Sequence, residues 1–164
     1  MQTKAQLSIC RLYRFALWRR WSEGPQVLFV MLNPSTADET KDDPTIRRCV
    51  GFAQSWSFGS LAVGNLFAFR TPSPSLLKSA SEPIGENNNS WLLRLQAGSH
   101  LAVAAWGNHG RFMGRSVAVR RLLPNLHTLG ITKLGEPGHP LYMPARKKLV
   151  LWHGSNDDNT FGKG

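Results

Sequence analysis

Residues 27–38 read V-L-F-V-M-L-N-P-S-T-A-D, and the fold of the chain can be worked out from this stretch. The unbroken apolar run of residues 27–32 is typical of a β-strand that is buried on both faces. Pro34 has no amide hydrogen and cannot extend a central strand, so we expect the chain to leave the sheet there. Ligands of open α/β sheets bind outside the carboxyl ends of the strands, and Asn33 lies at such an end. An Asn-Pro turn after a strand is also common in its own right.

Strand and helix patterns alternate along the rest of the chain. Apolar runs recur at 61–63, 100–106 and 126–131, and helical patterns lie between them at 44–56, 90–98 and 108–123. This alternation predicts a parallel sheet with right-handed crossovers. We therefore expect a three-layer α/β sandwich with a mostly parallel four-stranded central sheet. We also expect an N-terminal edge strand at 10–21, as the antiparallel neighbour of residues 27–32.

The remaining segments lack a clear period. Residues 1–8 are expected to be a loose start, and residues 71–89 a long loop, which in a compact domain is often functional. A single domain is expected to cover residues 1–150, followed by a flexible C-terminal tail at 151–164. The length of 164 residues fits one domain with a real core, since 41% of the residues are hydrophobic.

The charge points to an anionic partner. A net charge of +10 favours nucleic acid, here DNA, ahead of a membrane, although a merely basic surface is the plain alternative. Cys10 and Cys49 have no metal-site spacing and fit a reducing cytoplasm, so we expect no metal, no cofactor and a cytoplasmic location. No apolar run approaches the roughly 20 residues of a membrane helix, and no export signal is visible. The oligomeric state stays open, with a monomer favoured.

Four strand ends should meet at one edge of the sheet. They carry Asn33, Asn65, Trp106-Gly107 and His139-Pro140. Each also has a structural interpretation: Asn65 as a turn cap, Trp106 as packing, Gly107 as a turn residue and His139 as a backbone hydrogen-bond partner.

The loop before the first helix is acidic, with Asp38, Glu39, Asp42 and Asp43. Asp43 is the expected N-cap, with Pro44 at the first helical position. Capping and solvation explain most of these acids. A catalytic or metal-binding role for one of them is the alternative.

Several motifs carry a resemblance to a known family. The segments M-L-N-P-S-T-A-D, D-D-P-T-I-R-R-C, N-L-F-A-F-R, A-A-W-G and G-H-P-L-Y resemble the bacterial domain-of-unknown-function family numbered 1643, over residues 13–143. At one remove, the same landmarks resemble the uracil-DNA glycosylase superfamily. That resemblance implies a uracil-DNA glycosylase-like fold.

The resemblance to the glycosylases also implies roles. Asn33, in the turn with Pro34 and Ser35, would hold the attacking water, although both glycines of the G-x-N-P-G turn are missing. Asn65 would read the base edge, and Trp106-Gly107 match the W-G that often ends the third strand in that superfamily. His139 would support the developing base oxyanion, and Leu141-Tyr142 would wedge into DNA. The serine that follows His-Pro in that superfamily is absent here.

The chemistry of these residue types agrees with cleavage of an N-glycosidic bond. A fixed donor at the leaving base is worth about 3 kcal/mol, and an amide can donate and accept at once. Asn33 can only orient water, so a true general base would have to be Asp38, Asp42 or Asp43. Candidate residues for stacking the base are Phe52, Phe58 and Phe67, each of which is more often core.

Two classes of function follow. The first is a glycosylase-like hydrolase that releases a damaged or modified base from DNA, or acts on a nucleoside or nucleotide. The second is a non-catalytic nucleic-acid-binding module of the same fold. A weaker third is a metal-dependent phosphoesterase, which lacks a D-x-D or H-x-H pair. Candidate nucleic-acid contacts are Arg47, Arg48, Arg70 and Arg111. The arginines of residues 108–123 as a group are otherwise expected to form a solvated face.

Overall fold

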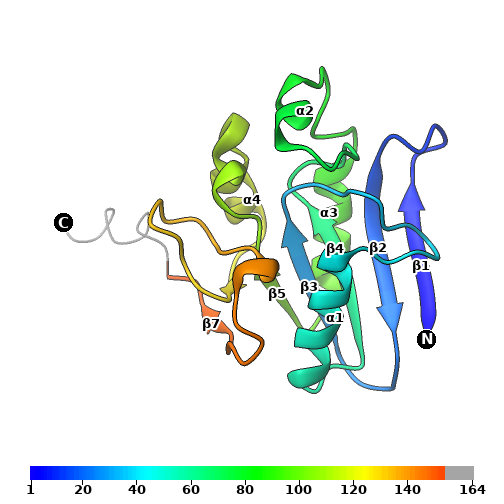
Figure 1. Cartoon of the computed structure of the whole chain (residues 1–164), viewed down its shortest axis with the longest axis vertical. Helices are drawn as coiled ribbons and strands as arrows, with labels where there is room; N and C mark the ends of the chain where they lie inside the picture. Colours follow the sequence, from blue (N-terminus) through cyan, green and yellow to red (C-terminus); the bar gives the residue numbers. More distant parts are fainter. Residues whose placement is uncertain (154–164) are drawn as a thin grey trace.

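A seven-stranded sheet, in the order β1-β2-β4-β3-β5-β6-β7, crosses the part of the chain that this computed structural model describes, residues 1–153 (Figure 1). Neighbouring strands among β4, β3, β5 and β6 are parallel, whereas β1, β2 and β7 pair antiparallel. The parallel centre is the four-stranded sheet that the apolar runs predict. The strands are β1 Gln2–Leu7, β2 Arg14–Arg20, β3 Gln26–Met31, β4 Ser60–Asn65, β5 Leu101–Ala104, β6 His127–Thr128 and β7 Val150–Leu151.

The N-terminal part differs from the prediction in three ways. The expected loose start is strand β1, whose polar residues gave no apolar signal. Strand β2 is not at an edge, because β1 flanks it on one side and β4 on the other. Strand β2 also does not pair with β3, since both sides of β3 are taken by its parallel partners β4 and β5.

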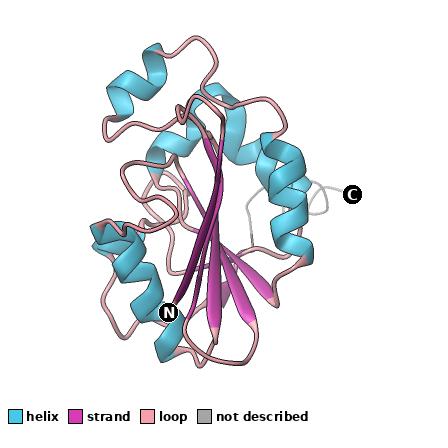
Figure 2. Cartoon of the chain, turned by 90° about the vertical axis from the view of Figure 1, so that its right-hand side faces the viewer, coloured by secondary structure: helices cyan, strands magenta, loops and turns pink. Residues whose placement is uncertain are grey.

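Helices cover both faces of the sheet, which makes three layers (Figure 2). Helix α1 packs on one face, where Phe29, Ile46 and Phe52 belong to one apolar cluster. Helices α3 and α4 pack on the other, where Leu92 and Val119 belong to a second cluster. The helices are α1 Pro44–Ser55, α2 Pro74–Ser79, α3 Asn88–Ala97 and α4 Arg115–Leu122, with 3-10 helices η1 Asn108–Gly114 and η2 Pro140–Tyr142.

The helix predictions have mixed outcomes. Helix α1 starts as predicted, because the Asp43 carboxylate accepts a hydrogen bond from the amide of Ile46 at 2.9 Å. The prediction of a single helix at 108–123 is wrong, because a left-handed turn separates η1 from α4. In this turn Met113 and Gly114 have φ of 56° and 63°. Helix α2 lies inside the predicted loop 71–89.

The C-terminal boundary falls at a strand. Strand β7 pairs with β6, and its last residue, Leu151, is where the flexible tail was predicted to begin. Residues 154–164 of that predicted tail lie outside the described residues. Within residues 1–153, no helix is both long enough and apolar enough to cross a membrane.

Candidate functional site

A cavity of about 600 Å³ opens where the four parallel strands end. Its size is within the range of small-molecule sites in proteins. Parallel strands deliver their carboxyl ends to one edge, so residues from the loops after β3, β4 and β5 and from the η2 loop meet there. The predicted site residues that line it are Asn33, Pro34, Ser35, Asp43, Asn65, Trp106, Gly107, His139, Leu141 and Tyr142. The predicted site residues outside its lining are Asp38, Phe67, Arg47, Arg48, Arg70 and Arg111.

Asn65 brings an unused amide to this cavity. It is the last residue of β4, it pairs in register with Met31 of β3, and only 1% of it is exposed. Neither the nitrogen nor the oxygen of its side chain has a hydrogen-bond partner among the described residues. Buried polar groups are almost always paired, so a buried amide with both atoms free at a cavity wall is suited to bind a ligand.

The backbone around Asn65 is held firmly by two buried side chains. The Asn88 amide donates to the carbonyl oxygens of Asn65 and Leu66 at 2.9 and 3.2 Å. The Arg115 guanidinium donates to Leu66 at 3.0 Å and is 4% exposed, and burial lowers its pKa. The prediction that Arg115 belongs to a solvated face is therefore wrong. These contacts position Asn65 through its main chain and leave its side chain free.

His139 presents a neutral imidazole at the same cavity. Its Nδ1 accepts a hydrogen bond from the backbone N–H of Leu141 at 3.2 Å, at the start of η2. The neutral ring therefore carries its proton on Nε2. Burial lowers the pKa of His139, and the nearby Asp43 carboxylate opposes this shift. At neutral pH the imidazole therefore offers one N–H donor and no positive charge.

The side-chain nitrogen of Asn33 is occupied by backbone contacts. Its side-chain nitrogen donates to the carbonyl oxygens of Thr71, Pro34 and Phe69 at 2.8, 3.0 and 3.4 Å. This nitrogen joins the loop after β3 to the loop after β4. For its side-chain oxygen, no hydrogen bond is found among the described residues, so Asn33 can meet water or a ligand as an acceptor.

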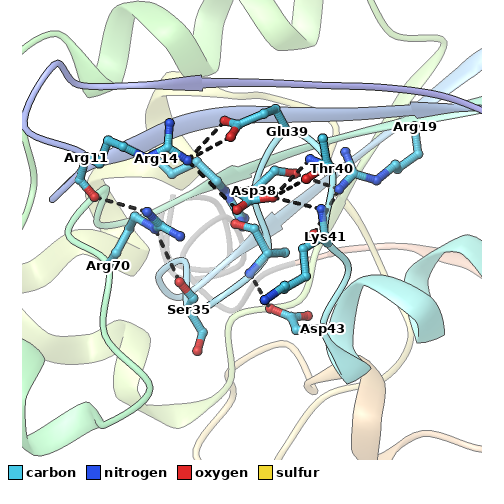
Figure 3. Close-up of polar contacts among 11 residues, drawn as sticks. Arg11, Arg14, Arg19, Ser35, Asp38, Glu39, Thr40, Lys41, Asp43 and Arg70 are labelled. Carbon is cyan, nitrogen blue, oxygen red and sulfur yellow. Dashed lines mark hydrogen bonds and ion pairs between the residues drawn. The ribbon is translucent and has the colours of Figure 1, made fainter.

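The acidic loop is held by contacts within the loop and with Arg11 and Arg19 (Figure 3). One oxygen of Asp38 accepts from the amides of residues 40 and 41 at 2.9 and 2.8 Å, which lowers the pKa of this carboxyl group. Arg19 forms an ion pair with Asp42 at 2.8 Å, and Arg11 one with Glu39 at 2.8 Å. Within residues 1–153 no group of three His, Cys, Asp or Glu side chains is placed to hold a metal ion.

Asp43 is the acid of this loop that reaches the cavity. One of its oxygens caps α1, and the other accepts from the amide of Ala37 at 3.4 Å. Both oxygens therefore already accept backbone N–H bonds, which leaves the carboxylate less free to act as a base.

The predicted nucleic-acid arginines divide into two pairs. Arg47 and Arg111 are exposed. Arg48 donates to two carbonyl oxygens of the η2 loop, and Arg70 donates to the carbonyl oxygens of residues 35 and 11. Arg48 and Arg70 thus brace the loops that surround the cavity.

The aromatic residues proposed to stack a base are core residues. Phe67 is fully buried, and its ring centroid is 5.6 Å from that of Phe112. Phe52 and Phe58 are also buried, in the cluster under α1, and none of the three lines the cavity. Both core clusters need large apolar side chains at these positions, which overrides the stacking role.

Trp106 and Gly107 shape the cavity wall after β5. The Trp106 indole N–H donates to the buried Glu136 carboxylate at 2.9 Å, and Ser116 donates to the same oxygen at 2.5 Å. Gly107 has φ of 74°, a conformation that favours glycine. At the mouth, Leu141 and Tyr142 are 44% and 84% exposed.

Sequence reasoning missed Arg14 as a cavity residue. Arg14 starts β2, lines the cavity and is 2% exposed. Burial lowers its pKa to about 10, so it stays charged at neutral pH. Its only sequence signal is the mixed character of both faces of residues 14–20, which have buried residues on each side.

Comparison with known proteins gives one match. The family described as "Protein of unknown function (DUF1643)" matches residues 14–141. No curated protein and no solved structure matches the chain.

Proposed function

This chain belongs to the DUF1643 family, and we propose that it is a uracil-DNA glycosylase-like hydrolase that releases a damaged or modified base from DNA. The base would enter the cavity at the carboxyl edge of the sheet. An enzyme of this kind must take the base out of the duplex, at a cost of a few kcal/mol.

The buried, unpartnered amide of Asn65 is the observation that carries this proposal. A side-chain amide offers one acceptor and two N–H donors in one plane, which complements the hydrogen-bonding edge of a nucleobase. Leaving these atoms unpaired costs stability in the free protein. A ligand that forms hydrogen bonds with both atoms would remove this cost, which favours binding of a base edge there.

His139 supports the leaving-group half of the reaction. As the bond between the sugar C1′ and the base nitrogen breaks, its electron pair leaves with the base, and a water oxygen bonds to C1′. The base takes up a proton, and the water releases one to solvent. The Nε2–H of His139 would donate to the base oxygen that gains negative charge, which is the kind of donor that enzymes aim at a developing oxyanion.

The cavity mouth and the loop after β3 supply the remaining parts. Leu141 and Tyr142 project apolar and aromatic surface beside the opening and would fill the gap in the base stack. The free oxygen of Asn33 would accept a hydrogen bond from the attacking water.

The test is single-turnover release of free base from oligonucleotides with one uracil, hypoxanthine or alkylated base, single- and double-stranded. We expect release from at least one of them, a loss of about 100-fold or more in His139→Ala, and altered base preference in Asn65→Ala. The matched control is His100→Ala, an exposed histidine next to the opposite end of β5. If the wild type releases nothing from any substrate, with or without EDTA, the catalytic proposal is wrong.

One observation favours a second candidate, a nucleic-acid-binding module that reads a base without cleaving it. The Asp43 carboxylate and the Asn33 amide nitrogen are already bonded to backbone groups. The cavity therefore has a base-reading amide and no carboxylate free of other bonds among the described residues. Base-dependent binding by the wild type without base release, lost in Asn65→Ala, would support this second candidate.

A further inference from the structure

Arg14 is a buried charge without a matched partner. Its Nη1 donates to the carbonyl oxygen of Ala37 at 3.0 Å, and its Nε has no hydrogen-bond partner among the described residues. In the same part of the chain, no carboxylate lies within ion-pair distance of this guanidinium. Asp43 and Asp38 act on it from farther away, and they favour its charged form. Buried charges in proteins are normally paired, because an unpaired one is costly.

Arg19, on the same strand, shows what a structural arginine looks like here. It is fully buried and forms an ion pair with Asp42 at 2.8 Å. It also donates to the carbonyl oxygen of residue 18 at 2.9 Å. Two more of its hydrogen bonds reach the carbonyl oxygens of Asp38 and Lys41, at 2.7 and 3.1 Å (Figure 3). Arg19 thus holds the loop at 35–43 and has most of its own N–H donors in hydrogen bonds. Arg14, in contrast, has N–H donors without partners among the described residues, and it lines the cavity.

The pairing of the backbone is irregular at Arg14. The pairing of β1 with β2 shifts register between Gln6 and Leu7, where Leu7 pairs with Arg14. Such irregularities re-aim a side chain and are common next to functional sites. The lining of the same cavity also includes Ser35, Thr45 and Thr71, whose hydroxyl groups can donate to an anion.

We propose that Arg14 is the oxyanion-binding residue of the cavity and holds a phosphate group of the ligand. A guanidinium presents paired N–H donors that match two phosphate oxygens and cannot accept, so it selects an anionic acceptor. This inference rests on the proposed function only in using the same cavity, and it requires no reaction there. The phosphate belongs either to a free mononucleotide or to an extruded nucleotide of a DNA strand.

The test measures binding without turnover. Thermal shift and isothermal titration would compare inorganic phosphate, a pyrimidine nucleoside, its 5′-monophosphate and a single-stranded oligonucleotide. With wild-type protein, the monophosphate should bind at least tenfold more tightly than the nucleoside. Arg14→Met should abolish this ratio, whereas Arg121→Met, which removes an exposed charge from the last turn of α4, should preserve it. A tenfold preference for the oligonucleotide over the monophosphate would assign the phosphate to DNA, and the reverse to a free nucleotide.

Apo stability keeps the proposal testable if binding is weak. Arg14→Met removes an uncompensated charge, so its Tm without ligand should equal or exceed that of the wild type, and Arg19→Met should unfold at a lower temperature. If Arg14→Met lowers Tm as Arg19→Met does, or if phosphate and monophosphate bind Arg14→Met as they bind wild type, the inference is wrong. If the wild type releases no base but still prefers the monophosphate over the nucleoside, the proposed function is refuted and the role of Arg14 is not.

Discussion

Replacing Asn65 with leucine should make the protein more stable while removing its ability to recognise a ligand. The two side chains have nearly the same shape, and Asn65 is 1% exposed with both polar atoms unpaired. A buried polar group without a partner costs about 1–3 kcal/mol. Asn65→Leu should therefore raise the free energy of unfolding by about 1–2 kcal/mol, which for a domain of this size raises Tm by about 2–8 °C.

Asn88 provides a matched control. It is the same residue type and equally buried, and its side-chain oxygen also has no hydrogen-bond partner among the described residues. Its nitrogen, however, donates to the carbonyl oxygens of Asn65 and Leu66. Asn88→Leu loses both bonds and should lower the free energy of unfolding by about 2–3 kcal/mol, or Tm by about 4–12 °C. The two substitutions should thus have opposite signs.

The assay is urea and thermal unfolding of wild type and both variants, followed by circular dichroism, with ligand binding measured on the same samples. Equal m-values would show that unfolding exposes the same surface in each variant, so that a shift of the urea midpoint reports a change in stability. If Asn65→Leu is destabilised as much as Asn88→Leu, the Asn65 amide makes structural contacts in solution, and its assignment as a ligand-binding group is refuted.

Three further predictions follow from other parts of the molecule. Burial lowers the pKa of His139 below the ordinary value of 6.5, so the unfolded chain binds this proton first and the free energy of unfolding should fall as the pH drops below 6.5. Urea titrations at pH 8, 6.5 and 5 should show a smaller fall of the free energy of unfolding in His139→Gln than in the wild type. Arg48→Met should free the η2 loop and slow base release about tenfold or more, while its DNA affinity, measured by filter binding, should change no more than that of Arg47→Met. Equal rates of base release in the two variants would contradict this prediction. Burial raises the pKa of Cys49, whereas a hydrogen bond with Ser8 lowers that of the exposed Cys10. After thiol alkylation, mass spectrometry should therefore find Cys10 alone modified in the folded protein and both cysteines modified in urea.

The parallel core of the fold can be predicted from the sequence because its signals are local. Long apolar runs mark β3, β4 and β5, and the Asp43-Pro44 pair marks the start of α1. Strands β1 and β7 and the break before α4 carry no such signal. The two edge strands are polar or very short, and the apolar period continues across the left-handed turn at Met113.

The same division holds for the candidate site. Strand ends of a parallel sheet meet at one edge, so the convergence of Asn33, Asn65 and His139 on one cavity could be expected from the sequence alone. Which of their atoms remain free could not, because the partners lie far along the chain. The Asn33 nitrogen is bonded to Thr71, and the Asn65 carbonyl oxygen is held by Asn88.

Arg14 illustrates this limit most clearly. A sequence pattern reports how often apolar residues recur, and an arginine in a mixed strand is expected at the surface. Long-range backbone pairing holds this residue in place: its amide donates to the carbonyl oxygen of Ala68 at 2.9 Å, and its side chain is buried beside the cavity. The local pattern determined the elements and the edge at which they meet, whereas long-range pairing decided which polar groups are satisfied and which remain for a ligand.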